Sequence, residues 1–280
     1  MVLLGAHMSI SGGFYKALLR GEELGCTAIQ IFTKNSNQWQ AKELSSEDIK
    51  RFKNTRKKTN IKTVVAHDSY LINLGSKDRE LLGKSKNSLL FELSRTENLG
   101  AKYLVMHPGS NPDEVDGIKR IADCLNWIHH KAPEYKAKIC LETTAGQGNA
   151  LGWRFEHLAQ IIDSVEEKSR LGVCYDTSHT FTAGYDIRDK EAYIKTFREF
   201  DRIIGLRKLM VFHLNDSKKN LGTRVDRHEH IGRGFLGLEA FRMLMNDTKF
   251  KKIPKIIETP QELNRDGENL KLLKSLVKEE

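Results

Sequence analysis

Eight short apolar runs recur along the chain, and a polar segment with helical periodicity follows each of them. A short continuous run rich in Val and Ile is typical of a parallel strand that is covered on both faces. The runs occupy residues 2–5, 28–32, 63–66, 103–106, 138–141, 171–175, 209–212 and 255–257. We expect helices near residues 14–24, 45–57, 79–99, 116–130, 154–165, 190–200, 238–245 and 263–277.

This alternation has no long linker and no low-complexity break, so it predicts an α/β fold consisting of one (β/α)₈ TIM barrel. A chain of 280 residues is an ordinary length for such a barrel, and we expect residues 1–280 to form a single domain. A doubly wound open sheet is the alternative. However, Gly12 and Gly13 stand alone after the first run, without a glycine-rich phosphate fingerprint, so no nucleotide cofactor is expected.

Composition restricts the surroundings in which the chain works. No apolar run approaches the roughly 20 residues of a membrane span, and the first residues lack the basic start of a secretion signal. The four cysteines form no CxxC pair, and Cys140 and Cys174 lie within apolar runs, so we expect buried free thiols in a reducing cytoplasm. The formal net charge of +9 favours a polyanionic partner.

The residues that end the last six apolar runs are the most informative feature for function. Each run delivers a side chain that can bind a metal: His67, His107, Glu142, Asp176 with His179, His213, and Glu258. In a parallel barrel these strand ends lie on one face around one mouth. Unpaired charges buried together would cost several kcal/mol each, so a cluster of multivalent cations is the expected way to hold them.

A second group of candidate ligands follows the seventh run. Asp226, His228 and His230 would share one face of an extended segment, and two of them could bind a cation, but the spacing does not say which two. The whole donor set is imidazole and carboxylate without thiolate. Such a set suits zinc in catalytic sites with open positions, and also manganese or iron.

Several longer stretches resemble the endonuclease IV family of apurinic/apyrimidinic (AP) endonucleases, and the resemblance covers nearly the whole chain. The stretches are residues 67–74 (HDSYLINL), 107–110 (HPGS), 142–148 (ETTAGQG), 172–179 (GVCYDTSH), 213–218 (HLNDSK) and 226–228 (DRH). The resemblance implies a TIM barrel that hydrolyses the phosphodiester 5′ to an abasic site in double-stranded DNA. It also implies a 3′-hydroxyl and a 5′-deoxyribose phosphate end as products of base excision repair.

The resemblance further implies three Zn²⁺ per chain, with Mn²⁺ as an alternative at one position. His67, His107 and Glu142 would hold one metal, and Glu142 would bridge to a second that Asp176, His213 and Glu258 complete. His179, Asp226 and His228 would hold the third, which leaves His230 outside. A metal-bound hydroxide held by this cluster, with Glu142 bridging, is then the expected nucleophile, and we expect no side-chain general base.

The expected DNA contacts also come from the resemblance. They are Asn35 and Gln38 in the loop 33–39, Tyr70 and Leu71 directly after His67, and Arg227. Tyr70 and Leu71 would act as a wedge beside an extruded abasic sugar, although local packing is the other explanation of such a pair. The chain departs from many relatives at Asn37, where they carry Arg. His7 is expected to be a hydrogen-bonding neighbour, and the chain to act as a monomer.

Three other functions compete with this hypothesis. A metal-dependent sugar isomerase or epimerase could use the same barrel, but it would gain nothing from the basic surplus or from the second ligand group. A non-catalytic DNA-binding or metal-storage protein would need coordinatively closed metals. An abasic-site lyase would need a desolvated lysine at a strand end, and none lies within the ligand series.

Overall fold

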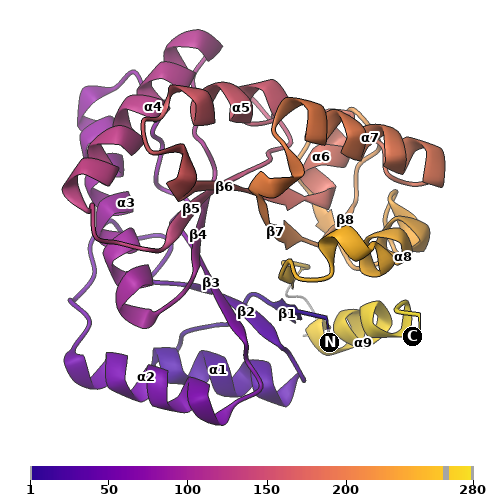
Figure 1. Ribbon diagram of the computed structural model, residues 1–280, viewed down its shortest axis with the longest axis horizontal. Helices are drawn as coiled ribbons and strands as arrows, with labels where there is room; N and C mark the ends of the chain where they lie inside the picture. Colours follow the sequence, from indigo (N-terminus) through magenta and orange to yellow (C-terminus); the bar gives the residue numbers. More distant parts are fainter. Residues whose placement is uncertain (1, 261–264, 279–280) are drawn as a thin grey trace.

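The eight predicted strands are present and form one parallel barrel in the computed structural model, which describes residues 2–260 and 265–278. Helices follow the strands and lie outside them (Figure 1). The barrel strands are β1 (Leu4–Ala6), β2 (Ala28–Phe32), β3 (Thr63–His67), β4 (Tyr103–Met106), β5 (Lys138–Glu142), β6 (Leu171–Asp176), β7 (Leu209–His213) and β10 (Lys255–Ile257).

The strand order is β1-β10-β7-β6-β5-β4-β3-β2, and the first and last strands of this order meet. A parallel bridge joins His7 to Gln30, and the amide of Met8 donates to the Gln30 carbonyl over 2.8 Å. Gly5 permits this close approach, because a Cβ there would collide with the carbonyl of Ala28. The sheet is therefore closed, which confirms the barrel and excludes the doubly wound alternative.

The helices begin and end close to the predicted positions. They are α1 (Phe14–Glu23), α2 (Ser46–Lys58), α3 (Arg79–Leu99), α4 (Glu114–Lys131), α5 (Phe155–Ser164), α7 (Lys190–Ile203), α8 (Gly237–Asn246) and α9 (Asp266–Ser275). The Ser45 hydroxyl caps α2 by accepting from the Asp48 amide. The predicted start of the last helix, at residue 263, lies outside the described residues.

Three short elements near the barrel mouth were not predicted. A seven-residue helix, α6 (Thr177–Ala183), follows β6 directly. Two short strands, β8 (Asp216–Ser217) and β9 (His228–Glu229), then pair in antiparallel fashion after β7. All three are too short to give a periodic sequence pattern.

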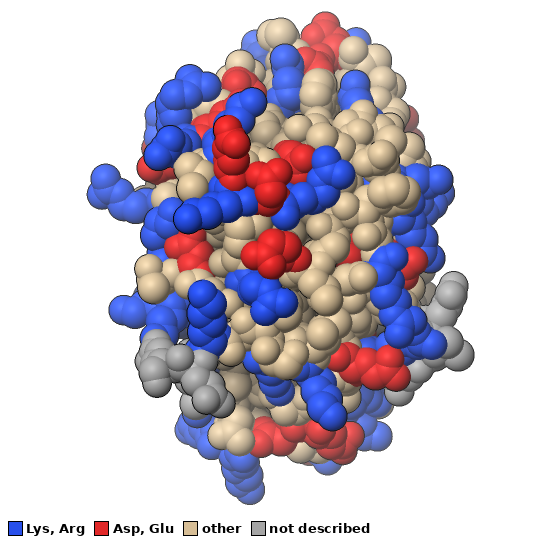
Figure 2. Space-filling model, turned by 90° about the vertical axis from the view of Figure 1, so that its right-hand side faces the viewer, with Lys and Arg blue, Asp and Glu red and all other residues tan. Residues whose placement is uncertain are grey.

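The described part of the chain contains no helix long and apolar enough to cross a membrane. Figure 2 shows the side of the molecule that carries α7, α8 and α9 in Figure 1. Lys and Arg are interspersed there with Asp and Glu, as on an ordinary solvated helix surface. This face gives no indication of where a polyanion would bind.

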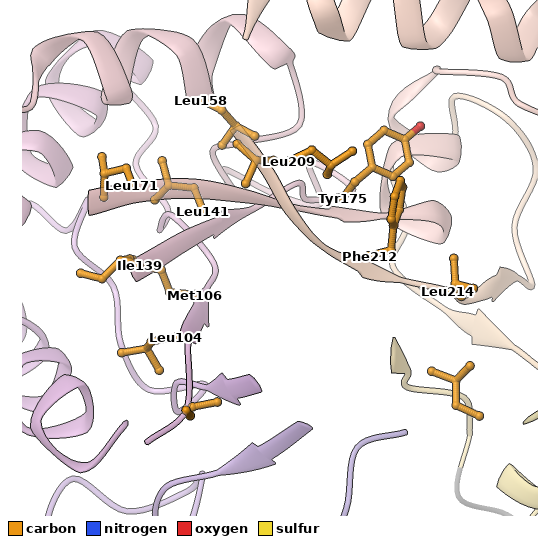
Figure 3. Close-up of a cluster of buried hydrophobic side chains, with 14 of the residues drawn as sticks. Leu104, Met106, Ile139, Leu141, Leu158, Leu171, Tyr175, Leu209, Phe212 and Leu214 are labelled. Atoms are coloured by element: carbon orange, nitrogen blue, oxygen red, sulfur yellow. The ribbon is translucent and has the colours of Figure 1, made fainter. Parts of the chain in front are cut away.

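Two separate apolar clusters lie on the two sides of the barrel wall. The larger one fills the space between strands and helices, where Leu141, Leu171 and Leu209 meet Leu158 of α5 (Figure 3). The smaller cluster fills the barrel interior with one side chain from each of seven strands. Its members are Ala28, Val65, Val105, Cys140, Cys174, Val211 and Ile256.

The interior cluster determines where the polar side chains lie. Side chains alternate along a strand, so the residue two positions further on points to the same side of the wall. On the seven strands these next positions are Gln30, His67, His107, Glu142, Asp176, His213 and Glu258. Gly5 of β1 pairs with Ile256, and the residue two positions later is His7. The apolar layer is thus followed by a polar layer at the carboxyl ends of the strands.

Candidate metal centre

Glu142, at the end of β5, occupies the middle of this polar layer and is fully buried. One of its carboxylate oxygens, Oε2, lies 3.1 Å from His67 Nε2 and 3.3 Å from His107 Nε2. The other oxygen, Oε1, lies 2.9 Å from His213 Nδ1. The two oxygens therefore face different sets of imidazoles, which is the arrangement that a bridging carboxylate needs.

A second group of potential donors lies on the Oε1 side. Glu142, Asp176, His213 and Glu258 each place one donor atom within 4.8 Å of the others, as do His67, His107 and Glu142 on the Oε2 side. His213 Nδ1 is the centre of this second group, because it also lies 3.1 Å from Glu258 Oε2. These two groups contain the same residues as the two ligand sets that the family resemblance implied.

The third group depends on α6 and on the β8–β9 pair, which were not predicted. Asp176 Oδ1 accepts from the His179 amide at the start of α6, and this helical turn directs His179 back to the mouth. The β8–β9 pairing brings His228 to the same place. Donor atoms of Asp176, His179 and His228 lie within 4.8 Å of one another.

Asp226 lies at the open side of this third group, and its side chain is 43% exposed. Its carboxylate is 3.2 Å from His179 Nε2 and 3.5 Å from His228 Nε2. The resemblance implied Asp226 as the third carboxylate, whereas the most compact group contains Asp176. Both acids are in reach, so the assignment of Asp226 stays a prediction.

His230 is turned away from the third group. It is buried, and its Nδ1 lies 3.0 Å from the side-chain amide of Asn269 on α9. The spacing of Asp226, His228 and His230 left open which two of them meet. The structure brings Asp226 and His228 together, and His230 packs elsewhere.

The bonds of the remaining imidazole nitrogens show that the site fits a set of cations. In three histidines, Nδ1 faces a backbone carbonyl. His67 Nδ1 faces the carbonyl of Asp68, His179 Nδ1 faces that of Thr143, and His228 Nδ1 faces that of Glu258. Donation to these carbonyls leaves Nε2 as a lone-pair donor directed into the site. The Nε2 atoms of His179 and His228 lie only 3.3 Å apart. Metal-ligating histidines are typically oriented in this way.

The charges of the buried groups depend on one another. Burial opposes ionisation of Glu142, but the imidazoles of His213 and His107 outweigh it and hold the pKa of this carboxyl well below its usual range. Burial likewise opposes the charged form of His179, while Asp176 and Asp226 raise its pKa well above the ordinary value. The acids therefore stabilise protons on the histidines, and a cation would have to displace those protons.

Gln30 belongs to the same polar layer and was missed by the sequence analysis. Its amide oxygen faces His213 Nε2 at 2.8 Å, while its nitrogen donates to Glu258 Oε1 over 2.5 Å and lies 3.1 Å from His7 Nδ1. Donation from His213 Nε2 to Gln30 leaves Nδ1 directed at Glu142. The only sequence signal was a polar residue inside the apolar run 28–32. His7 has the expected role of a hydrogen-bonding neighbour.

Two cavities open beside the metal-binding groups, and Tyr70 lines both of them. The smaller, of about 280 Å³, is also lined by His107, His179 and Asp226. The larger, of about 580 Å³, is also lined by His228 and Glu258, and by residues after β1 and β2.

Of the five residues predicted to contact DNA, Asn35 and Tyr70 line these cavities, and the DNA contacts of all five stay predictions. Asn35 and Gln38 are exposed on the loop after β2, and Tyr70 is 66% exposed after β3. Leu71 is half-buried. Arg227 is exposed, and its guanidinium donates to the Asp226 carbonyl.

Comparison with known proteins identifies the family. The chain is 49% identical over 280 residues to a probable endonuclease 4 from Geotalea daltonii, and the match covers 99% of this chain and 98% of that protein. The chain belongs to the endonuclease IV family. The crystal structure of endonuclease IV from Thermus thermophilus superposes with a TM-score of 0.88 at 34% identity, over 98% of each chain. Residues 18–276 also match the broader family described as xylose isomerase-like TIM barrel.

The endonuclease IV barrel is shared with proteins of other activities. A D-tagatose 3-epimerase-like protein superposes with a TM-score of 0.73, but at only 19% identity over 97% of this chain and 96% of that one. A likeness of this kind shows the fold alone. It explains why the barrel left a sugar epimerase open as an alternative, whereas the full-length likeness to endonuclease IV proteins removes that ambiguity at the level of the family.

Proposed function

We propose that this member of the endonuclease IV family is a metal-dependent AP endonuclease of base excision repair. It hydrolyses the phosphodiester 5′ to an abasic site in duplex DNA and leaves a 3′-hydroxyl and a 5′-deoxyribose phosphate. One observation carries the proposal: a buried carboxylate, Glu142, directs its two oxygens at two groups of imidazoles, and a third donor group adjoins them at the mouth of the barrel.

We assign three cations to these groups, with zinc as the metal and Mn²⁺ as an alternative at one position. His67 and His107 would hold the first together with Glu142, which also reaches the second. Asp176, His213 and Glu258 complete the second, and His179, Asp226 and His228 hold the third. Divalent cations held there would activate water as a nucleophile and neutralise charge on the scissile phosphate. The thiolate-free donor set supports zinc in an open, catalytic site.

The side chains contribute position and charge. Glu142 and Glu258 keep their negative charge despite burial, because the imidazole of His213 lowers the pKa of both carboxyls. The backbone carbonyls that accept from His67 and His179 fix the direction in which each ring presents its free nitrogen. A preorganised set of this kind needs little rearrangement when the phosphate arrives.

The exposed mouth supports a duplex with a missing base as the substrate. Tyr70 lines both cavities. If the abasic sugar were extruded into one of them, the aromatic ring would lie close to the base stack. Extrusion is easiest where no base is stacked or paired, which would favour abasic positions over intact ones. The basic surplus of +9 adds attraction to DNA that does not depend on sequence.

The cysteines bear on where the protein works. All four are free and buried, and burial raises the pKa of the Cys26 and Cys124 thiols to about 11. Unreactive thiols of this kind support the proposed cytoplasmic location. We also propose that the chain acts as a monomer, and sedimentation of the protein alone and with DNA would test this.

The decisive experiment combines elemental analysis with a nicking assay. The purified protein should carry close to three zinc ions, and it should nick a duplex with a single abasic site far faster than the same duplex intact. Chelation should abolish nicking and zinc should restore it. Full activity of metal-free protein would overturn the mechanism. Turnover of ketoses with no nicking would favour the epimerase, and a borohydride-trapped DNA adduct would indicate the lyase.

A further inference from the structure

Lys34 and Glu92 form an ion pair that is completely shielded from solvent beneath the barrel mouth. Lys34 Nζ lies 3.1 Å from Glu92 Oε1, and both side chains have no exposed area. Lys34 belongs to the loop after β2, whereas Glu92 lies in the middle of α3. Lysine in a loop that is expected to meet DNA would ordinarily be a phosphate contact. Here its amine is directed inward instead.

The same lysine closes the turn that carries two of the predicted DNA contacts. Its amine donates to the Gln38 carbonyl over 2.5 Å, so the ion pair fixes the segment between Lys34 and Gln38. Asn35 is exposed within this segment, and its side-chain oxygen accepts from the Asn37 amide. The exposed edge of the loop is therefore shaped from its buried side.

Glu92 also holds the loop after β3. The Ser69 amide donates to Glu92 Oε1 over 3.3 Å, and Ser69 immediately precedes Tyr70. Oε2 accepts from the Thr33 hydroxyl over 3.4 Å. One buried carboxylate thus joins the loop that carries Gln38 to the loop that carries Tyr70, although the two loops follow different strands.

Arg95 lies nearly one turn further along α3 and binds the first of these loops. Its guanidinium donates to the carbonyls of Thr33 and Lys42, over 2.7 and 2.9 Å, and lies over the ring of Phe91. Arg95 is almost as buried as Lys34. It therefore offers a matched comparison, because its hydrogen bonds to described residues go to the loop after β2 and not to the loop after β3.

We propose that Glu92 is a positioning residue that holds both predicted DNA-contacting loops in one fixed relation, with Lys34 as its internal counterion. The link between the loops is a property of the free protein. Its importance for abasic DNA rests on the function proposed above. Truncating one partner of a buried pair leaves the other charge uncompensated, whereas replacing both by apolar side chains of similar size is often tolerated.

The first test is hydrogen exchange in the absence of DNA, so that it does not depend on the proposed function. Glu92→Gln, and the double variant Lys34→Met with Glu92→Leu, should speed exchange of peptides from both residues 33–38 and residues 68–72. Arg95→Met should speed exchange in the first segment only. Lys168→Met, which breaks the exposed ion pair with Asp163 on another face, should change neither segment. Faster exchange in only one segment of the Glu92 variants, or in neither, would overturn the proposal.

The second test is binding to an abasic duplex over a range of salt concentrations. The double variant should keep its full zinc content and lose about tenfold or more in affinity, with an unchanged slope of log affinity against log salt. If Lys34 contacted a phosphate, its loss would instead reduce the magnitude of that slope by about 0.9. Such a drop, or an unchanged affinity in a variant whose loops have loosened, would refute the positioning role. If the wild-type protein does not bind abasic DNA, the proposed function is wrong. The hydrogen-exchange result would still show whether Glu92 links the two loops.

Discussion

The guanidinium of Arg224 lies 4.1 Å from the centre of the Trp153 ring, and this contact joins the loop after β7 to the loop after β5. Arg224 Nε also donates to the Gly146 carbonyl over 3.1 Å. Arg224 has a φ of 55°, a left-handed conformation that costs energy for a residue with a side chain. Two residues further on, the Asp226 amide donates to the side chain of Gln147. The exposed Asp226 is therefore positioned by its neighbours.

Trp153→Ala should weaken retention of the cation assigned to the third group. Losing a cation–π contact of about 0.5–2 kcal/mol would free Arg224 and let the segment with Asp226 move. We expect the variant to lose one metal per chain to a mild chelator that leaves the wild-type protein fully loaded. Elemental analysis after dialysis measures this. Trp153→Phe keeps a ring and should retain the metal; equal retention by Trp153→Ala would refute the role of the contact.

Gln30→Leu should lower metal affinity without disturbing the barrel. The Gln30 amide fixes which nitrogen His213 presents to Glu142, and it binds Glu258 as well. Loss of such outer partners costs about 10–100-fold in metal affinity or activity. Competition with a coloured zinc chelator measures the affinity, and circular dichroism checks the fold. An affinity within about twofold of the wild-type value would show that His213 is oriented by other contacts.

The fold and most of the candidate site follow from the sequence because both depend on local periodicity. An apolar strand that ends in His67 or Glu142 must place that side chain at the carboxyl end of a parallel barrel. Gln30 was not predicted as a site residue because it lies inside an apolar run and because a side-chain amide does not indicate a metal site. The helix that orients His179 is too short for a periodic signal.

Contacts between residues far apart in the chain could not be predicted. Lys34 has the sequence context of a surface lysine, and its burial depends on Glu92, which lies much later in the chain on another element. The relation of Asp226 to Asp176 is of the same kind, because it depends on how the loop after β7 folds back over α6. The spacing of residues along the chain does not predict such long-range contacts.

His129→Leu should make the protein less sensitive to acid. Burial of His129 on α4, with a smaller contribution from Arg170, lowers its pKa from 6.5 to about 4. Between these values the unfolded chain binds a proton that the folded protein does not, so stability falls as the pH falls from 6.5 towards 4. At a pH of about 4.5, His129 alone should lower the free energy of unfolding by about 2 kcal/mol relative to its value at neutral pH.

Urea unfolding of chelator-treated protein at neutral pH and at a pH of about 4.5 would measure this cost, since chelation removes the pH dependence of metal binding. The loss of stability between the two pH values should be about 2 kcal/mol smaller in His129→Leu than in the wild-type protein. Equal losses in both proteins would mean that His129 titrates normally in the folded state.

Tyr70→Ala should weaken binding to abasic duplex and leave the metal content intact. The ring is 66% exposed, and it is supported by an edge contact to Phe32 with ring centres 5.5 Å apart. Contact between a base and an aromatic ring is worth about 1–3 kcal/mol, so affinity should fall by about 5- to 150-fold. Fluorescence anisotropy with abasic and intact duplexes measures it. Tyr70→Phe should bind like the wild-type protein; unchanged affinity in Tyr70→Ala would assign the ring to local packing.

Asn37→Arg should tighten binding to abasic duplex, because it adds a long, positively charged side chain at an exposed position of the loop 33–39. Asn37 is exposed at the turn that Lys34 holds from its buried side, so a longer side chain has room to extend into solvent. A guanidinium that reaches a phosphate would steepen the salt dependence by about 0.9, whereas one inserted into the base stack would raise affinity with the slope unchanged. Asn37→Gln adds length without charge and should bind like the wild-type protein. Binding by Asn37→Arg that is no tighter than wild type, at any salt concentration, would mean that this loop does not face the duplex.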